Sequence, residues 1–314
     1  MTVDVLAEAA RVAAPSALAT VIATAGSSPR HAAAKMIVAA SGEQLGTVGG
    51  GRIELEVVER ARAVAAGAPA ERVDKHLGHD LAMCCGGRMS VWIEPLDRSR
   101  LVALAEAARR RGRRTPVALV TALASPGGKD LLERDDTLRT RRPRLEGDRF
   151  IEPILPTERL VLFGGGHVAR ALAPLAASVG FEIVVCDEDE RFADEERFPG
   201  ARLVGTFDVA EAARELDPFG PDDYVIITTR DHGIDERVLE RLLPRVDLTY
   251  LGLIGSRGKL GRFRKRLEAR GLADPEPWAR LHSPVGLEIG AETPEEIAVS
   301  VVAEMVRARH ARVS

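Results

Sequence analysis

A glycine turn in the second half of the chain has the spacing of a phosphate-binding loop. The apolar run 160–163 leads into GGGHVA at 164–169, which matches G-x-G-x-x-A between a predicted strand and a predicted helix. Gly164 permits a tight turn, and Gly166 lets the backbone approach a pyrophosphate at the helix start. Asp187 ends the next predicted strand, where an acid would hold a ribose hydroxyl. The pattern predicts a dinucleotide-type site, and the alternative is a packed turn without a ligand.

Two further segments follow predicted strands of the same half. His232 comes after the strand 223–228, and Ser256 and Arg257 come after the strand 249–254. Because the carboxyl ends of parallel strands meet at one edge of a sheet, we expect these side chains beside the glycine turn. Ser256 and Arg257 either bind a second anion or act as a helix cap and a solvated charge.

Hydride transfer would need an acid or base beside a nicotinamide. The Tyr-x-x-x-Lys pair of short-chain dehydrogenases is absent, because neither Tyr224 nor Tyr250 is followed by such a lysine. His232 could serve, although a single loop histidine more often has a structural role. An NAD(P)-dependent oxidoreductase therefore remains the alternative function.

Two glycine-rich loops in the first half each end in arginine. GSSPR spans 26–30 and GTVGGGR spans 46–52. Backbone N–H groups of such loops can cradle an oxyanion, and the guanidinium groups of Arg30 and Arg52 suit bidentate oxyanion recognition. Either loop alone is more simply explained as a turn, but two in one domain favour a binding role.

Cys84 and Cys85 precede two glycines and a predicted strand at 89–93. Glycine on one side leaves a thiol accessible to a bulky partner or a metal. His76 and His79 lie upstream, but their spacing to the cysteines fits no standard zinc site. Two interpretations stay open: a buried, unreactive thiol pair, or a functional thiolate for a soft metal or for sulfur transfer.

The elements that must position these residues are clearest after residue 156. Short β-rich runs alternate with helical stretches, which predicts a C-terminal Rossmann-like, doubly wound parallel sheet of about five strands. The expected strands are 160–163, 182–186, 201–204, 223–228 and 249–254. The expected helices are 167–179, 209–216, 234–243, 258–270 and a last one that starts with a capping box at Thr293.

The mixture of strand-like and helix-like segments in the first half predicts an N-terminal mixed α/β domain. Its expected strands are 18–24, 35–39, 44–48, 89–93 and 116–122, and its expected helices are 53–66 and 101–111. The segment from Pro143 to Pro156 interrupts any regular pattern and is predicted to hold the boundary between two domains. This divides the chain into domains at 1–155 and 156–314.

Composition limits the class of protein. The chain has 314 residues, of which 45% are apolar, and a formal charge of −3, which excludes a long disordered chain and argues against a nucleic-acid partner. The first half holds 23 basic and 19 acidic residues and the second half 21 and 28, so a mildly basic domain precedes an acidic one. No signal peptide, membrane-length run or disulfide framework is visible, which predicts a reduced, cytoplasmic protein without a membrane partner.

Seven segments together resemble the xanthine dehydrogenase accessory-factor family (XdhC/CoxI type). They are GSSPRHAAAKMIV, GTVGGGRIE, CCGGRMSVWIEP, VLFGGGHVA, TTRDHGID, LIGSRGK and SPVGLEIGAETPEEIAVS. The resemblance runs from Leu18 to Arg309 in the expected order, and GLEIGAETPEEIA is its most specific piece. The Cys-Gly-Gly of the family matches Cys85, and His167, which follows Gly165 and Gly166 in the glycine turn, also fits the family pattern.

Members of this family look like molybdenum-cofactor chaperones, so the resemblance implies binding rather than catalysis. Such a protein holds the molybdopterin cofactor while a cysteine desulfurase supplies the terminal sulfido ligand. It then inserts the cofactor into an apo molybdenum hydroxylase of the xanthine dehydrogenase or aldehyde oxidoreductase type. The resemblance also implies a homodimer. Molybdopterin carries a phosphate and its cytosine form is a dinucleotide, which suits a Rossmann-type site.

The resemblance and the residues together predict which side chains contact this cofactor. Cys85, or its neighbour Cys84, is the expected molybdenum contact, because a thiolate is a soft ligand. Arg30 and Arg52 would face the cofactor from the same side. The opposite side would be formed by Gly164, Gly165, Gly166, His167, Asp187, His232, Ser256 and Arg257.

Overall fold

The computed structural model of the chain divides into two compact units, Thr2–Pro156 and Thr157–Ser314. It describes residues 5–9, 12, 15–81, 86–124, 128–216, 218–272 and 274–312. None of the helices in these ranges is both long and apolar enough to pass through a lipid bilayer.

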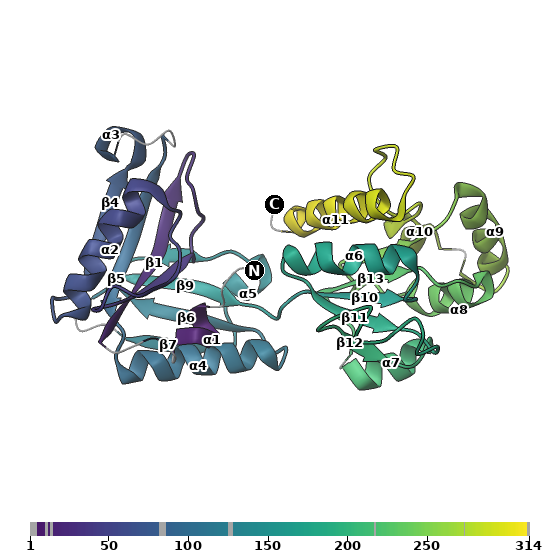
Figure 1. The fold of residues 1–314 in the computed structure, drawn as a ribbon, viewed down its shortest axis with the longest axis horizontal. Coiled ribbons are helices and arrows are strands. Elements are labelled where there is room, and N and C mark those ends of the chain that lie inside the picture. Colours follow the sequence, from purple (N-terminus) through teal and green to yellow (C-terminus); the bar gives the residue numbers. More distant parts are fainter. Residues whose placement is uncertain are drawn as a thin grey trace. The chain divides into compact units, whose positions relative to one another are not determined.

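The described part of the first unit contains two antiparallel sheets, with the strand orders β3-β2-β1-β5-β4 and β7-β6-β9-β8. Its elements are α1 (Val5–Glu8), β1 (Ser16–Ala25), β2 (Lys35–Ala39), β3 (Gln44–Gly46), α2 (Gly51–Ala65), β4 (Glu71–His76), α3 (Leu77–Leu81), β5 (Arg88–Pro95), α4 (Arg98–Gly112), β6 (Val117–Ala122), β7 (Lys129–Leu132), α5 (Asp136–Thr140), β8 (Arg144–Glu146) and β9 (Arg149–Ile154). Helix α2 packs Ile53, Val57, Ala61 and Val64 against the five-stranded sheet (Figure 1). This stripe at helical spacing explains why the segment forms an amphipathic helix.

Two buried ion pairs join the sheets of the first unit. Lys35 of β2 pairs with Glu152 of β9. Lys129 of β7 lies 2.6 Å from Glu94 of β5, and both side chains are fully buried. Each pair takes one residue from each sheet, so the sheets are linked by charge as well as by apolar packing.

The irregular structure predicted between Pro143 and Pro156 is wrong, although the chain does divide at the end of this segment. Strands β8 and β9 form a hairpin over this segment, and Phe150 and Ile151 of β9 are buried. Gly147, between the two strands, has a φ of 59° and makes the hairpin turn. In the sequence, the same glycine suggested an interruption of regular structure. The segment thus belongs to the core of the first unit, and the division falls after Pro156.

The described part of the second unit contains one parallel sheet of six strands, in the order β12-β11-β10-β13-β14-β15. Its elements are β10 (Arg159–Phe163), α6 (His167–Ser178), β11 (Glu182–Cys186), β12 (Arg202–Val204), α7 (Val209–Leu216), β13 (Asp223–Ile227), α8 (His232–Leu242), β14 (Tyr250–Leu253), α9 (Arg257–Glu268), α10 (Pro275–Arg280), β15 (Leu281–His282) and α11 (Pro294–Ala311). In chain order this is 3-2-1-4-5-6, the order of a Rossmann fold. The predicted Rossmann-like domain is confirmed, with the two-residue strand β15 added to the five expected strands.

Helices cover both faces of this sheet. Helices α6 and α11 lie side by side on one face (Figure 1), where Ala169, Leu172 and Met305 pack against the strands. Helices α7, α8 and α9 contribute to the core on the other face. Helix α11 starts with the predicted capping box between Thr293 and Glu296.

Candidate functional site

The glycine turn after β10 uses its three glycines differently. A Cβ on Gly164 would lie 2.5 Å from the carbonyl oxygen of Thr228, and a Cβ on Gly165 would overlap the carbonyl oxygen of Phe192. Gly166 is the N-cap of α6, has no side-chain cap and would meet no atom within 4 Å. Close packing therefore requires the first two glycines, and the third leaves the N–H groups at the start of α6 open to an anion.

The acid predicted for the end of β11 is in place, and the chain itself uses both of its oxygens. Asp187 is 2% exposed and its Oδ2 accepts a hydrogen bond from the N–H of Gly165 at 2.9 Å. Its Oδ1 accepts from the N–H of Asp189 at 3.1 Å and from the guanidinium of Arg230 at 3.1 Å. Arg230 also lies over the ring of Phe192, 3.3 Å from its centroid. Asp187 thus holds the glycine turn to the ends of β11 and β13.

His167 and His232 both belong to the edge where the strands end. His167 begins α6 and is exposed. The His232 side chain is 70% exposed and its Nδ1 lies 3.8 Å from the carboxylate of Asp235. Both imidazoles are accessible to a ligand or to solvent.

A buried ion pair at the same edge was not predicted from the sequence. Asp235 of α8 is 0% exposed and pairs with the ammonium group of Lys259 in α9, which also donates to the carbonyl of Ile254 at 2.9 Å. The other oxygen of Asp235 accepts from the hydroxyl of Thr229 at 2.7 Å. The sequence carried one signal: Lys259 occupies the first position of a buried i, i+4, i+8 stripe whose other members are apolar.

Ser256 and Arg257 both have partners within the chain. Ser256 is the N-cap of α9, and its hydroxyl accepts from the N–H of Lys259 at 3.3 Å. Arg257 is exposed and pairs with Glu288, in the segment between β15 and α11. The ion pair links the most specific motif of the sequence to the edge where the strands end.

In the first unit, three glycine-containing segments meet. A Cβ on Gly49 would lie 2.7 Å from Cγ of Pro29, so the loops 46–52 and 26–30 are in contact. The N–H of Gly87 donates to the carbonyl of Ser27 at 3.0 Å, and a Cβ on Gly87 would overlap that oxygen. These contacts bring together the two arginine-tipped loops and the glycines that follow the cysteine pair.

The two arginines of these loops are exposed. A guanidinium nitrogen of Arg52 lies 3.4 Å from the carbonyl oxygen of Leu81, at the end of α3. In the described part of the chain, the Arg30 side chain forms no hydrogen bond or ion pair. Both cations are therefore accessible beside the segments that flank residues 82–85.

Three N–H groups of loop 46–52 are taken up by a carboxylate of the chain itself, so these three do not cradle an oxyanion ligand as the sequence predicted. Glu54, in the first turn of α2, accepts from the N–H groups of Val48, Gly49 and Gly50 at 3.0, 3.2 and 3.0 Å. It also accepts from the hydroxyl of Thr47. Burial raises the pKa of Glu54, but these hydrogen bonds outweigh it and lower the pKa below its ordinary value. The Glu54 carboxylate thus occupies the position in which these three N–H groups could bind an anionic ligand.

The predicted molybdenum contacts, Cys84 and Cys85, lie outside the described residues. Cys186 is buried in β11, and burial raises the pKa of its thiol to about 12. This thiol is therefore unreactive at neutral pH.

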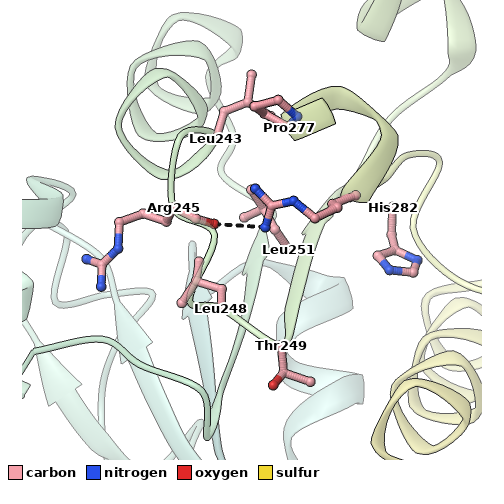
Figure 2. A pocket seen from close by; sticks show the side chains of 8 residues that line it. Leu243, Arg245, Leu248, Thr249, Leu251, Pro277 and His282 are labelled. Atoms are coloured by element: carbon pink, nitrogen blue, oxygen red, sulfur yellow. Dashed lines mark hydrogen bonds between the residues drawn. The ribbon is translucent and has the colours of Figure 1, made fainter. Parts of the chain in front are cut away.

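A small cavity of about 150 Å³ lies at the opposite edge of the second unit's sheet, where β14 begins (Figure 2). Arg280 lines it and donates to the carbonyl oxygen of Arg245 at 3.1 Å. Both arginines are paired with carboxylates, Arg245 with Asp247 and Arg280 with Glu276. The cavity is below the usual size of a ligand pocket and lies away from the edge where parallel sheets bind ligands.

Two family models match the chain. Residues 160–305 match the XdhC Rossmann domain, and residues 9–74 match the XdhC and CoxI family.

Similar proteins cover nearly the whole chain. A probable xanthine dehydrogenase subunit of Bacillus subtilis (strain 168) is 30% identical over 93% of this chain and 92% of its own length. The uncharacterized protein YqeB of Escherichia coli (strain K12) is 32% identical over 94% of this chain, which spans only 44% of that relative. The crystal structure of a xanthine dehydrogenase (BH1974) from Bacillus halodurans superimposes with a TM-score of 0.82 at 28% identity, covering 98% of this chain and 96% of that one.

Proposed function

The chain belongs to the XdhC and CoxI family, and we propose that it binds the molybdenum cofactor and delivers it to an apo molybdenum hydroxylase. The observation that carries this proposal is the meeting of three glycine segments in the first unit, at Gly49 with Pro29 and at Gly87 with Ser27. These segments are the ones that end in arginine or follow the cysteine pair. The charges of Arg30 and Arg52 thus lie on loops that meet the glycines following Cys85 in the sequence, which supports a site for a phosphate group.

In this proposal, arginine side chains bind the phosphate of the cofactor and a cysteine thiolate binds its molybdenum. Molybdopterin carries a phosphate, which the guanidinium groups of Arg30 and Arg52 suit because they form bidentate, charge-assisted hydrogen bonds. We assign the molybdenum contact to the thiolate of Cys85, since thiolates are soft ligands. Glu54 has a supporting part: it accepts from the N–H groups of Val48, Gly49 and Gly50, so we assign phosphate recognition to the arginine side chains.

The name of the B. subtilis relative supports a partner of the xanthine dehydrogenase type. We further propose that a cysteine desulfurase acts on the bound cofactor, that the protein is a homodimer and that it works in the cytoplasm. Each of these follows from the family resemblance and is tested separately, by co-purification, by sedimentation and by cell fractionation.

The test is purification from a host that makes the cofactor, followed by measurement of molybdenum and of the oxidised pterin by its fluorescence. We expect stoichiometric cofactor on the wild type and activation of an apo xanthine dehydrogenase in a transfer assay. Cys85→Ala should lose most of the bound sulfurated cofactor, Cys84→Ala shows whether the neighbouring thiol contributes, and the buried Cys186→Ala is the control. A wild-type protein that carries neither molybdenum nor pterin would refute the proposal, and turnover of a small substrate with NAD(P) would establish the alternative.

A further inference from the structure

A second, larger cavity lies in the second unit, at the residue that follows Asp187. It has a volume of about 470 Å³, within the usual range of ligand pockets. It is formed by the residue after Asp187, by the connection from β12 to α7, and by one side of α8. These segments follow the strands on the side of the sheet where ligands of parallel sheets bind.

The residue after Asp187 is the acid that faces this cavity. Glu188 is exposed, lines the cavity and has no partner among the described side chains and backbone groups. Asp187 is buried, and both of its oxygens accept hydrogen bonds from the chain. A carboxylate available to accept hydrogen bonds from a ribose is therefore supplied by Glu188 rather than by Asp187.

The floor of the cavity is apolar, and its rim carries two arginines. Four residues make the floor: Phe207, Val209, Ile234 and Val238. Arg237 and Arg241 lie one helical turn apart on α8, and neither forms a side-chain hydrogen bond or ion pair with another described residue, although Arg237 interacts with Asp231 through space.

The other two acids of the cavity are already used. Asp208 accepts from the N–H of Glu211 at 2.8 Å, and Glu240 pairs with Arg270 at 3.1 Å. The groups left for a ligand are one carboxylate, two guanidinium groups and an apolar floor.

We propose that this cavity binds the nucleoside part of a nucleotide. The base packs on the apolar floor and stacks against a guanidinium plane, Glu188 accepts hydrogen bonds from the ribose hydroxyls, and the phosphates extend toward Gly166 at the start of α6. Asp187, the residue before Glu188, accepts a hydrogen bond from the N–H of Gly165 at 2.9 Å, so the chain connects this side of the cavity to the glycine turn. The site stands independently of the proposed function, which bears only on whether its natural ligand is the nucleotide part of the cofactor.

The ribose contact is tested by calorimetric titration of the full chain with CDP, 2′-deoxy-CDP and ADP. We expect the wild type to bind CDP about 10-fold more tightly than 2′-deoxy-CDP. This is the affinity that the loss of one hydrogen bond to a charged group would cost. Glu188→Ala should abolish this preference, and the exposed Glu190→Ala should keep it. A preference that survives in Glu188→Ala would overturn the ribose assignment, and this ratio does not change if a variant is merely less stable.

The arginines are tested with the same ligands. Arg237→Ala and Arg241→Ala should each weaken CDP and ADP binding about 10-fold, whereas Arg214→Ala on the exposed side of α7 should not. Comparison of CDP with ADP shows which base the floor prefers.

The experiments distinguish a failure of the cavity proposal from a failure of the proposed function. Cofactor binding without any nucleotide binding would overturn the cavity and leave the proposed function. Nucleotide binding that depends on Glu188, in a protein that carries no cofactor, would support the cavity and refute the proposed function.

Discussion

The carboxylate of Glu54 accepts a hydrogen bond from the backbone N–H of Gly50 at 3.0 Å, and thereby closes the anion-binding loop with an anion of the chain itself. Asp187 does the same for Gly165 in the second unit. In both glycine turns one carboxylate from a neighbouring element takes up backbone donors that a ligand would otherwise use. The turns are therefore preorganised before any ligand binds.

Glu54→Gln should lower the free energy of unfolding at pH 7 by about 1.5–3 kcal/mol, because hydrogen bonds to a charged acceptor are replaced by weaker ones. The pKa of Glu54 is lowered in the folded protein, so its contribution is present above the pKa of the unfolded chain and is lost as the pH falls through the folded value. Urea unfolding at pH 7 and at about pH 3 measures this. The difference between variant and wild type should shrink at the lower pH, and Glu59→Gln on the same helix should show neither effect.

Lys259→Met should destabilise the second unit by about 3–5 kcal/mol, because it leaves the carboxylate of Asp235 buried without its cation. The double variant Lys259→Met/Asp235→Asn should recover part of this loss, since the amide oxygen still accepts from Thr229 without carrying a charge. Equilibrium denaturation of the single and double variants measures the coupling. Lys265→Met, at an exposed position of α9, is the control. Equal losses in the single and double variants would contradict a charge-based cost.

Cys186 should not react with a thiol reagent in the folded protein. Burial raises the pKa of this thiol to about 12, so at pH 8 it is neither ionised nor accessible. The variant with Cys84→Ser and Cys85→Ser isolates it. Titration with Ellman's reagent should give no release of thionitrobenzoate before denaturation and one equivalent of thiol afterwards. Rapid reaction of the folded variant would show that β11 opens readily.

Gly165→Ala and Gly166→Ala should separate folding from binding. The first substitution puts a methyl group against the carbonyl of Phe192 and should cost about 1–3 kcal/mol of stability. The second meets no atom and should change stability by less than about 0.5 kcal/mol, yet weaken nucleotide binding by obstructing the start of α6. Thermal unfolding and CDP titration of both variants give the two readouts. A Gly166→Ala variant with full nucleotide affinity would argue against phosphate contact at this turn.

The fold of the second half could be predicted because its strands are short apolar runs separated by helices of regular period. The strands that were missed lack this signal. In β4 only Val73 is buried, because β4 is an edge strand, and β15 has two residues that pair only with β14. The hairpin of β8 and β9 was missed because its Gly147 turn has the residue types that also mark a domain boundary.

The site was only partly predictable, because spacing along the chain shows which groups are present but not which partners they find. The glycine turn, Asp187 and the Ser256 cap were placed correctly from local pattern. That Glu54 satisfies loop 46–52 depends on the angle at which α2 leaves the loop. That Lys259 reaches Asp235, 24 residues away, depends on the packing of two helices, which no local pattern encodes.

The ion pairs between the sheets of the first unit also decide where the chain can be shortened. A fragment that ends at Pro143 would keep Lys35 buried but remove Glu152, its counter-ion, together with the strand β9 that pairs with β6. The buried ammonium would then lack its counter-ion, which strongly destabilises the folded state. The shortest stretch of the first half that can fold by itself therefore extends through β9, and a protease site introduced before β8 would split a folding unit rather than release a domain.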